Sequence, residues 1–315
     1  MPFALRRMAD LGGPALREVV TATFRPKGAR YHASRLKRFP IRALRGGPDG
    51  LGVAYALRPE GITVTILARG ACTEDDTEWA LAAARGIAAL DDDPTEFFDL
   101  ARQHPRIERL ARRFDCRIPR TVTVFETFAR VVIEQLVTTW EARNSTRKLF
   151  GHAGLLIEGT RLRAAPTPEA VLGVAPWKLR AFGIGVRRVR TLREGARRGA
   201  ALERLRDVDP AIAIEKIQSL PGVGPWTANN VARDALAYAD AVPVGDFHAH
   251  DLVSLALTGE PGDDARMLEL LEPFRPHRSR AAHLLMLGQM AEALPGVAPR
   301  PLPRIDPHRR EPWKY

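Results

Sequence analysis

A short glycine-rich stretch in the C-terminal half constrains the fold more than any other part of the sequence. Residues 217–232 read Ile-Gln-Ser-Leu-Pro-Gly-Val-Gly-Pro-Trp-Thr-Ala-Asn-Asn-Val-Ala. The glycines at 222 and 224 allow a sharp backbone turn, including positive φ, that a residue with a Cβ atom resists. Pro225 suits the first turn of a helix, where its missing N–H has no partner in any case. The pattern predicts two helices, over 210–220 and 226–238, joined by a tight turn.

The predicted turn has the properties of a phosphate-binding site. Backbone N–H groups of the turn and of the following helix start point outward together, and such groups bind anions. The run fits a helix-hairpin-helix motif, which holds a DNA backbone without reading its sequence. We expect the DNA contacts to come from Leu220, Gly222, Val223, Gly224 and Thr227. The alternative is an ordinary hairpin between two core helices.

The bulk composition agrees with a polyanionic partner. The 315 residues carry a formal net charge of +11, and the pI is about 10.4. This balance favours nucleic acid, although it is modest evidence alone. The two cysteines, Cys72 and Cys116, exclude a disulfide scaffold and a four-cysteine metal cluster. The N-terminal residues form no long apolar run, so we expect no signal peptide, no membrane span and a cytoplasmic protein.

The N-terminal part predicts a small sheet covered by helices. Residues 52–58 and 62–67 alternate in the manner of β-strands around Pro59-Glu60-Gly61, which indicates a hairpin. Residues 2–20 predict a weak helix, and further helices are expected over 79–90 and 94–112. The run Asp91-Asp92-Asp93 before Pro94 favours a helix cap over a metal site.

From about residue 119 onward the sequence predicts helices throughout. They are expected over 123–139, from Pro168, over 185–199, in the two hairpin segments, and over 263–271 and 279–293. The arginines at 190, 193 and 197 form a stripe that suits solvent and DNA equally well. The fold class is therefore α+β and mostly helical. The expected division is an N-terminal domain with an antiparallel sheet over 1–117, a helical domain over 118–294 and a Pro/Arg-rich tail over 295–315.

The order of motifs along the helical region resembles the helix-hairpin-helix superfamily of DNA glycosylases. It is most similar to the bacterial alkylpurine branch, 3-methyladenine-DNA glycosylase II. The matching segments are Ile-Glu-Gln-Leu-Val at 133–137, Pro-Thr-Pro-Glu-Ala at 166–170, the hairpin, Val-Gly-Asp at 244–246 and Pro-His-Arg-Ser at 276–279. The resemblance covers about residues 119–293, and the small N-terminal sheet fits that branch loosely.

The resemblance implies that Asp246 is the catalytic residue. Glycosylases must extrude a damaged nucleotide before they reach its glycosidic bond. Cleavage builds positive charge on the sugar, which a fixed carboxylate stabilises. Alkylated purines are already cationic and leave easily, so no strong general acid is required. A simple helix cap is the alternative role for Asp246, and the two roles are compatible.

The resemblance also implies a base pocket and a mechanism. Bifunctional members carry a nucleophilic lysine at the position of Trp226, and an indole cannot form a Schiff base. The expectation is therefore a glycosylase without lyase activity, in which Trp226 and Phe247 line the pocket. Asn230 stands where this branch can carry tyrosine, and Met286 stands near an expected tryptophan. The cysteine motif of iron–sulfur members is absent, and no cofactor is expected.

Other candidates flank this pocket. Gln135 and Leu136 match the segment that enters the duplex in the family, and Leu136 is either an apolar wedge or a core residue. His248 is expected to meet phosphate. His248 and His250 diverge on a helix, so we expect no catalytic metal. The family suggests a monovalent ion on carbonyl groups near Leu220 and Val223.

These features together predict a monofunctional glycosylase that excises alkylated purines of the 3-methyladenine and 7-methylguanine type during base excision repair. Its partner would be double-stranded DNA containing damaged bases. We expect a monomer in the bacterial cytoplasm, associated with the nucleoid. One alternative keeps the fold but acts on oxidised, deaminated or mismatched bases. Another is a non-catalytic DNA-binding module that uses only the hairpin.

Overall fold

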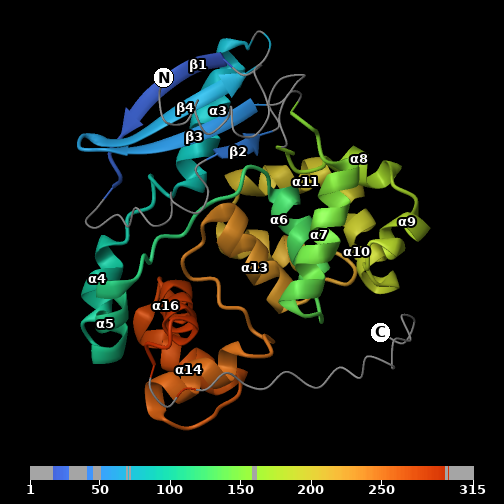
Figure 1. Cartoon of the computed structure of the whole chain (residues 1–315). Helices are drawn as coiled ribbons and strands as arrows, with labels where there is room; N and C mark the ends of the chain where they lie inside the picture. Colours follow the sequence, from blue (N-terminus) through green and yellow to red (C-terminus); the bar gives the residue numbers. More distant parts are fainter. Residues whose placement is uncertain are drawn as a thin grey trace.

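An antiparallel sheet occupies one end of the molecule and two groups of helices occupy the other (Figure 1). The computed structural model describes residues 17–27, 41–44, 51–68, 70, 72–157, 162–294 and 297. Within them the protein has an α+β fold that is mostly helical, which confirms the expected class. No helix of the described residues is long and apolar enough to cross a membrane.

The sheet contains the predicted hairpin. Its strands are β1 (Arg17–Phe24), β2 (Ile41–Leu44), β3 (Leu51–Arg58) and β4 (Gly61–Ala68), in the order β1-β4-β3-β2. All pairs are antiparallel, and β3 and β4 are joined by the expected turn at residues 59–60. The weak helix over 2–20 is wrong for residues 17–20, which lie in β1, and residues 1–16 lie outside the described residues.

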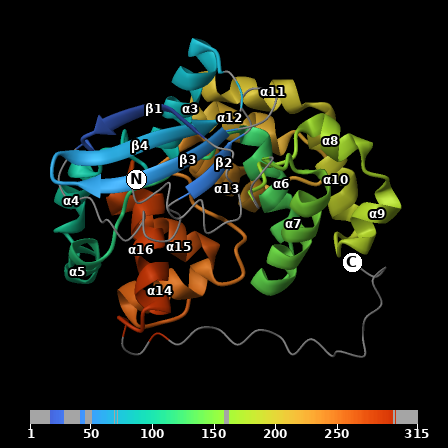
Figure 2. The ribbon, with the colours of Figure 1, turned by 45° about the horizontal axis from the view of Figure 1, so that its top comes forward.

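Helix α3 (Glu74–Ile87) packs its small residues on the sheet (Figure 2). Ala80 and Ala84 are fully buried against Val64 and Ile66 of β4. The hydroxyl of Tyr55 donates a hydrogen bond to the carbonyl of Ala84 at 3.0 Å, so the one polar atom of this buried side chain is satisfied. The sheet and α3 thereby share one core.

The smaller helical group joins two distant parts of the sequence. It contains α4 (Thr95–Ala101), α5 (Pro105–Arg113), α14 (Ala249–Thr258), α15 (Asp264–Leu271) and α16 (Arg278–Met290). Their apolar residues form a second core. The single helix predicted over 94–112 is wrong, because the chain breaks at residues 102–104 and restarts at Pro105, which cannot donate the N–H that a continuous helix needs.

The larger helical group builds a third core around Phe125, Phe128 and Val132. Its helices are α6 (Val124–Glu134), α7 (Thr139–Ala153), α8 (Pro168–Gly173), α9 (Pro176–Ala181), α10 (Val186–Arg197), α11 (Gly199–Glu203), α12 (Pro210–Gln218) and α13 (Pro225–Leu236). Two short 3-10 turns lie at Arg204–Asp207 and Glu272–Phe274. The helix predicted over 123–139 is wrong beyond Glu134, where Leu136 adopts a φ of 52° and α7 starts separately. The expected domain boundaries stay a prediction.

A buried ion pair ties the segment between α3 and α4 to the last helix. Both terminal nitrogens of Arg280 donate to the carboxylate of Asp92, at 2.6 and 2.7 Å, and Ile118 N–H donates to the same carboxylate. The Arg280 side chain is only 3% exposed. Within the acidic run it is Asp93 that accepts from the N–H of Thr95 at the start of α4. Asp92 therefore links segments that are far apart in the sequence.

Two helical glycines provide a test of the third core. A Cβ atom at Gly195 would lie 2.0 Å from Cε1 of the buried Phe128, whereas Gly151 has open space around it. We expect Gly195→Ala to lower the free energy of unfolding by about 1–3 kcal/mol through overpacking. Gly151→Ala should raise it by about 0.5–1 kcal/mol through helix propensity. Chemical denaturation of both variants measures this, and equal stabilities would contradict the packing of α10 on α6.

Candidate active site

The loop between α13 and α14 positions Asp246. It leaves α13 through Ala237, whose φ of 57° is left-handed, and passes the buried Asp240. Gly245 has a φ of 85°, which glycine adopts without strain, and its N–H donates to Asp264 at 2.9 Å. The loop therefore places Asp246 at the start of α14.

Three N–H groups hold the carboxylate of Asp246. One oxygen accepts from the backbone N–H groups of His248 at 2.9 Å and Ala249 at 3.0 Å. The other oxygen accepts from the indole N–H of Trp226 at 2.8 Å. Nδ1 of His250 lies 3.0 Å from the Asp246 carbonyl oxygen. Asp246 thus accepts hydrogen bonds from the first N–H groups of α14 and also from Trp226, and its catalytic role stays a prediction.

The four candidate residues for the base pocket differ in their burial and in their contacts. Trp226 is half-buried and contacts Asp246 directly, as the sequence predicts for two residues of one site. Asn230 is 8% exposed, and its amide donates to the carbonyl of Trp226. Phe247 is 43% exposed, with its ring edge-on to the ring of His248 at 4.8 Å. Met286, on α16, is 40% exposed.

The hairpin turn forms as the glycines predict. Gly222 has a φ of 81°, and the N–H of Val223 donates to the carbonyl of Leu220 at 3.1 Å. Gly222 and Gly224 are exposed. Leu220 and Thr227 have buried side chains, 6% and 2% exposed, which anchor the turn in the third core and leave its backbone outside.

The end of α6 is fastened to this turn. The Gln135 amide donates to the Gly222 carbonyl at 3.1 Å and to the Thr227 hydroxyl at 2.9 Å. Leu136 follows with 97% of its surface exposed, so the core alternative for this residue is excluded. Trp140 is 72% exposed. The side chain of Gln135 therefore links the hairpin to the segment that carries the exposed Leu136.

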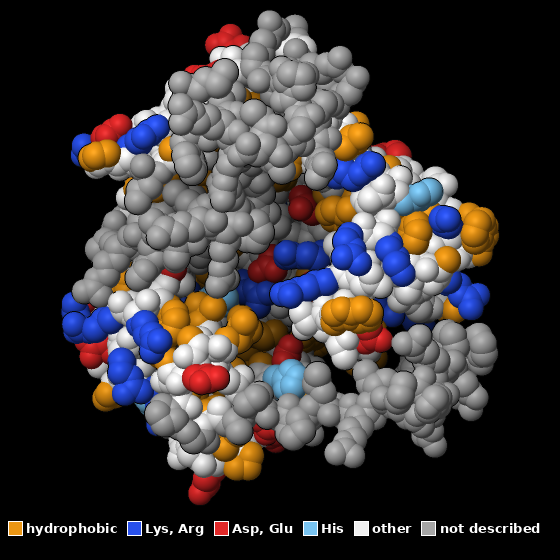
Figure 3. Space-filling view, in the orientation of Figure 1, with side chains coloured by type: hydrophobic (Ala, Val, Ile, Leu, Met, Phe, Trp, Pro, Cys, Tyr) orange, Lys and Arg blue, Asp and Glu red, His pale blue; other side chains and the backbone are white. Residues whose placement is uncertain are grey.

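Sequence reasoning missed a set of charged residues between α6 and α13. Arg130 donates to Asp234 at 2.7 Å, and Arg233 donates to the other oxygen of Asp234 at 2.7 Å. Glu134 lies one turn after Arg130, and burial raises the pKa of its carboxyl group. The available signal was the spacing of Arg130 and Glu134, four residues apart on one helix. Figure 3 shows Lys and Arg side chains over α7 along one wall of a hollow, with hydrophobic side chains opposite.

A wider basic groove lies between α9, α10 and the hairpin. It has a volume of about 730 Å³, and Pro221 and Gly222 form part of its lining. The arginines of the predicted stripe differ in their contacts. Arg193 donates to the carbonyls of Leu172 and Val174, and Arg197 pairs with Glu194. Further arginines of the groove are Arg180, Arg187 and Arg190. The groove therefore meets the turn that the sequence assigns to phosphate binding.

Known proteins share this fold and parts of the sequence. No family model matches the chain. A probable bifunctional transcriptional activator/DNA repair enzyme AlkA of Mycobacterium tuberculosis is 27% identical over 216 residues, which is 67% of this chain and 42% of the relative. DNA-3-methyladenine glycosylase 2 of Escherichia coli is 29% identical over 175 residues, 53% of this chain and 59% of the relative. The chain thus spans about half the length of these curated relatives.

The structural comparison agrees with the sequence comparison. The 3-methyladenine DNA glycosylase of Archaeoglobus fulgidus superposes with a TM-score of 0.72 and 23% identity, over 88% of this chain and all of that one. The chain thus has the fold of the helix-hairpin-helix DNA glycosylases, and its sequence is similar to those of the alkylpurine glycosylases named above.

Proposed function

We propose that the protein is a monofunctional DNA glycosylase that extrudes alkylated purines, of the 3-methyladenine and 7-methylguanine type, from duplex DNA and hydrolyses their N-glycosidic bond. The relatives named above are DNA repair enzymes and 3-methyladenine glycosylases. The observation that carries the proposal is the Asp246 carboxylate, fixed by the α14 N-terminus and the Trp226 indole, on a scaffold that also presents the hairpin.

The chemistry requires a carboxylate that does not move. As the glycosidic bond breaks, the sugar gains oxocarbenium character, and a preorganised negative charge stabilises it. The three N–H donors already fix the orientation of Asp246, so little reorganisation accompanies the reaction. The Trp226 ring beside this carboxylate provides an aromatic surface for the extruded base. A cationic alkylpurine is a good leaving group without further acid catalysis.

The same scaffold explains how DNA would be held. The hairpin turn binds phosphate through its backbone N–H groups, and Leu136 fills the space of the extruded nucleotide. The basic groove beside Pro221 and Gly222 extends the positive surface away from the turn. Binding through phosphates releases counterions, so affinity should fall steeply with salt.

Replacing the carboxylate tests the catalytic assignment. We expect Asp246→Asn to lower base release from methylated duplex DNA by about a hundredfold or more, because the amide lacks the negative charge. Asparagine is also a good helix cap, so the fold and DNA affinity should persist. Chromatographic analysis of the freed bases measures this. Asp251→Asn makes the same change five residues later, on α14, and should retain activity. Undiminished turnover in Asp246→Asn would contradict the assignment.

The monofunctional mechanism has its own test. Borohydride reduces a Schiff base between an enzyme amine and an abasic sugar to a stable adduct, and Trp226 offers no amine. We expect no covalent protein–DNA adduct under conditions in which wild type releases alkylated base. Trp226→Lys serves as the comparison, because it places an amine at this position. An adduct formed by the wild-type protein on gel electrophoresis would contradict the mechanism.

Substitutions of the two hairpin glycines test two properties separately: the geometry of the turn and the access of a phosphate group to it. A Cβ at Gly222 would lie 2.0 Å from the Thr191 hydroxyl at a positive φ, whereas Gly224 has open space around it. Gly222→Ala should lower the free energy of unfolding by about 1–3 kcal/mol through backbone strain. Gly224→Ala should leave stability unchanged and weaken duplex binding, because its methyl group enters the phosphate site. Thermal unfolding and binding titrations measure both, and full affinity in Gly224→Ala would contradict this site.

A further inference from the structure

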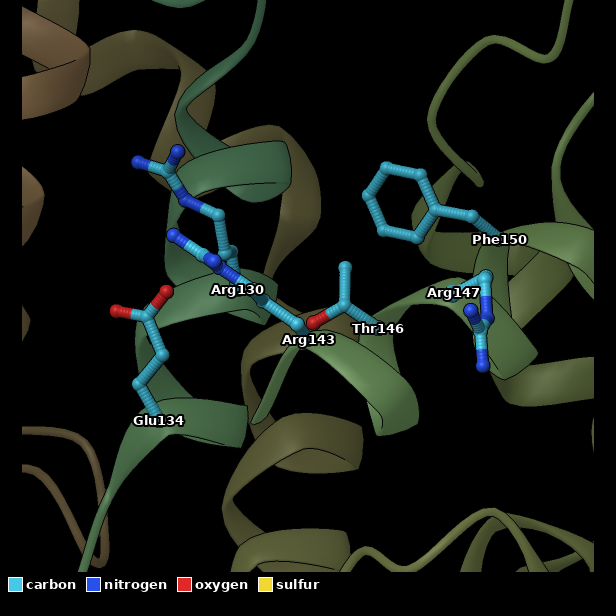
Figure 4. Close-up of a pocket in the computed structure, with 6 residues that line it drawn as sticks. All are labelled: Arg130, Glu134, Arg143, Thr146, Arg147 and Phe150. Carbon is cyan, nitrogen blue, oxygen red and sulfur yellow. The ribbon is translucent and has the colours of Figure 1, made fainter. Parts of the chain in front are cut away.

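A cavity with charged side chains in its lining lies between α6 and α7. Its volume is about 250 Å³. Figure 4 shows that the carboxylate of Glu134 points toward the guanidinium groups of Arg130 and Arg143. The cavity is lined by Arg130, Glu134, Arg143, Thr146, Arg147 and Phe150. Acidic and basic side chains thus meet in a space close in size to a small-ligand site.

Helix pairing sets the level of Glu134 along α13, the helix that carries Trp226. Helices α6 and α13 run antiparallel, since Arg130 contacts Asp234 and Gln135 contacts Thr227. Glu134 therefore lies level with the first half of α13, which carries Trp226 and Asn230. Burial acts to lower the pKa of Arg233, but the charges of Asp234, Glu134 and Asp246 raise it. The charges of Glu134 and Asp246 thus act on the same guanidinium group of α13.

The Glu134 carboxylate is available to a ligand. Its neighbour Arg130 is engaged by Asp234 and Arg147 by Asn144. In the part of the chain that the structure describes, Glu134 and Arg143 make no hydrogen bond or ion pair with other protein groups. Glu134 remains accessible to solvent, although surrounding protein desolvates it enough to raise its pKa. A ligand with hydrogen-bond donors would satisfy both carboxylate oxygens.

We propose that Glu134 determines base specificity by accepting hydrogen bonds from the two adjacent donors, N1–H and the N2 amino group, of an extruded guanine-type base. This inference rests on the proposed glycosylase function. The two oxygens of a carboxylate match two neighbouring N–H donors. Adenine-type bases place an acceptor nitrogen beside their amino group, and its lone pair repels the second oxygen. Arg143 donates to the O6 acceptor on the same guanine edge.

The test compares the release of two bases from one substrate. Methylated duplex DNA contains 7-methylguanine and 3-methyladenine, and chromatography measures both. We expect Glu134→Gln to lower the release of 7-methylguanine relative to 3-methyladenine by about tenfold or more, because the amide has one acceptor and turns a donor toward the base. The assay is run at about pH 8, above the usual carboxyl range. Glu169→Gln, an exposed glutamate on α8, is the matched control and should leave the ratio unchanged.

Equal loss of both bases in Glu134→Gln would show a structural role and overturn the proposal, as would an unchanged ratio. Binding of free 7-methylguanine and free 3-methyladenine, followed by tryptophan fluorescence, separates this inference from the proposed function. If wild type binds 7-methylguanine more tightly and Glu134→Gln loses that preference, Glu134 reads the base even where no base is released from DNA. If wild type neither binds nor releases either base, both proposals fail.

Discussion

The site depends on a buried carboxylate that is not part of it. The side chain of Asp240 is 2% exposed, and it accepts hydrogen bonds from the guanidinium groups of Arg275 and Arg278. A buried charge is tolerated only with such partners, and removal of one partner leaves an uncompensated charge. Asp240 stands at the start of the loop that ends in Asp246. The ion pairs therefore fix the loop from the side of α16, and the helix start of α14 fixes it from the other.

A ladder of polar contacts likewise holds α6 in place against α13, on the side that we expect to face DNA. Arg130 and Asp234 close one end of the ladder, and Gln135 closes the other at Gly222 and Thr227. Helix α6, which ends two residues before Leu136, cannot shift against the hairpin without breaking these bonds. The contacts thereby fix the position of Leu136 relative to the hairpin turn. Glu134 lies on the same helix between these two contacts, with its carboxylate outside both of them.

The elements that the sequence predicts well are those with local chemical signals. The hairpin glycines and the turn at Pro59 each specify backbone geometry within a few residues, and the structure has both. The break after α6 carries no glycine or proline, because Leu136 itself takes the left-handed conformation. The pairing of Arg130 with Asp234 joins residues 104 positions apart, so no local pattern contains it. The pocket candidates Phe247 and Met286 depend on tertiary placement in the same way.

Leu136 has a consequence for the stability of the protein without DNA. It exposes 97% of a large apolar surface to water and holds a backbone conformation that a side chain disfavours. The backbone conformation costs free energy in the folded protein, and the exposed side chain contributes no burial that offsets this cost. Glycine would adopt the same φ without strain. The leucine side chain therefore adds nothing to the stability of the fold that carries it.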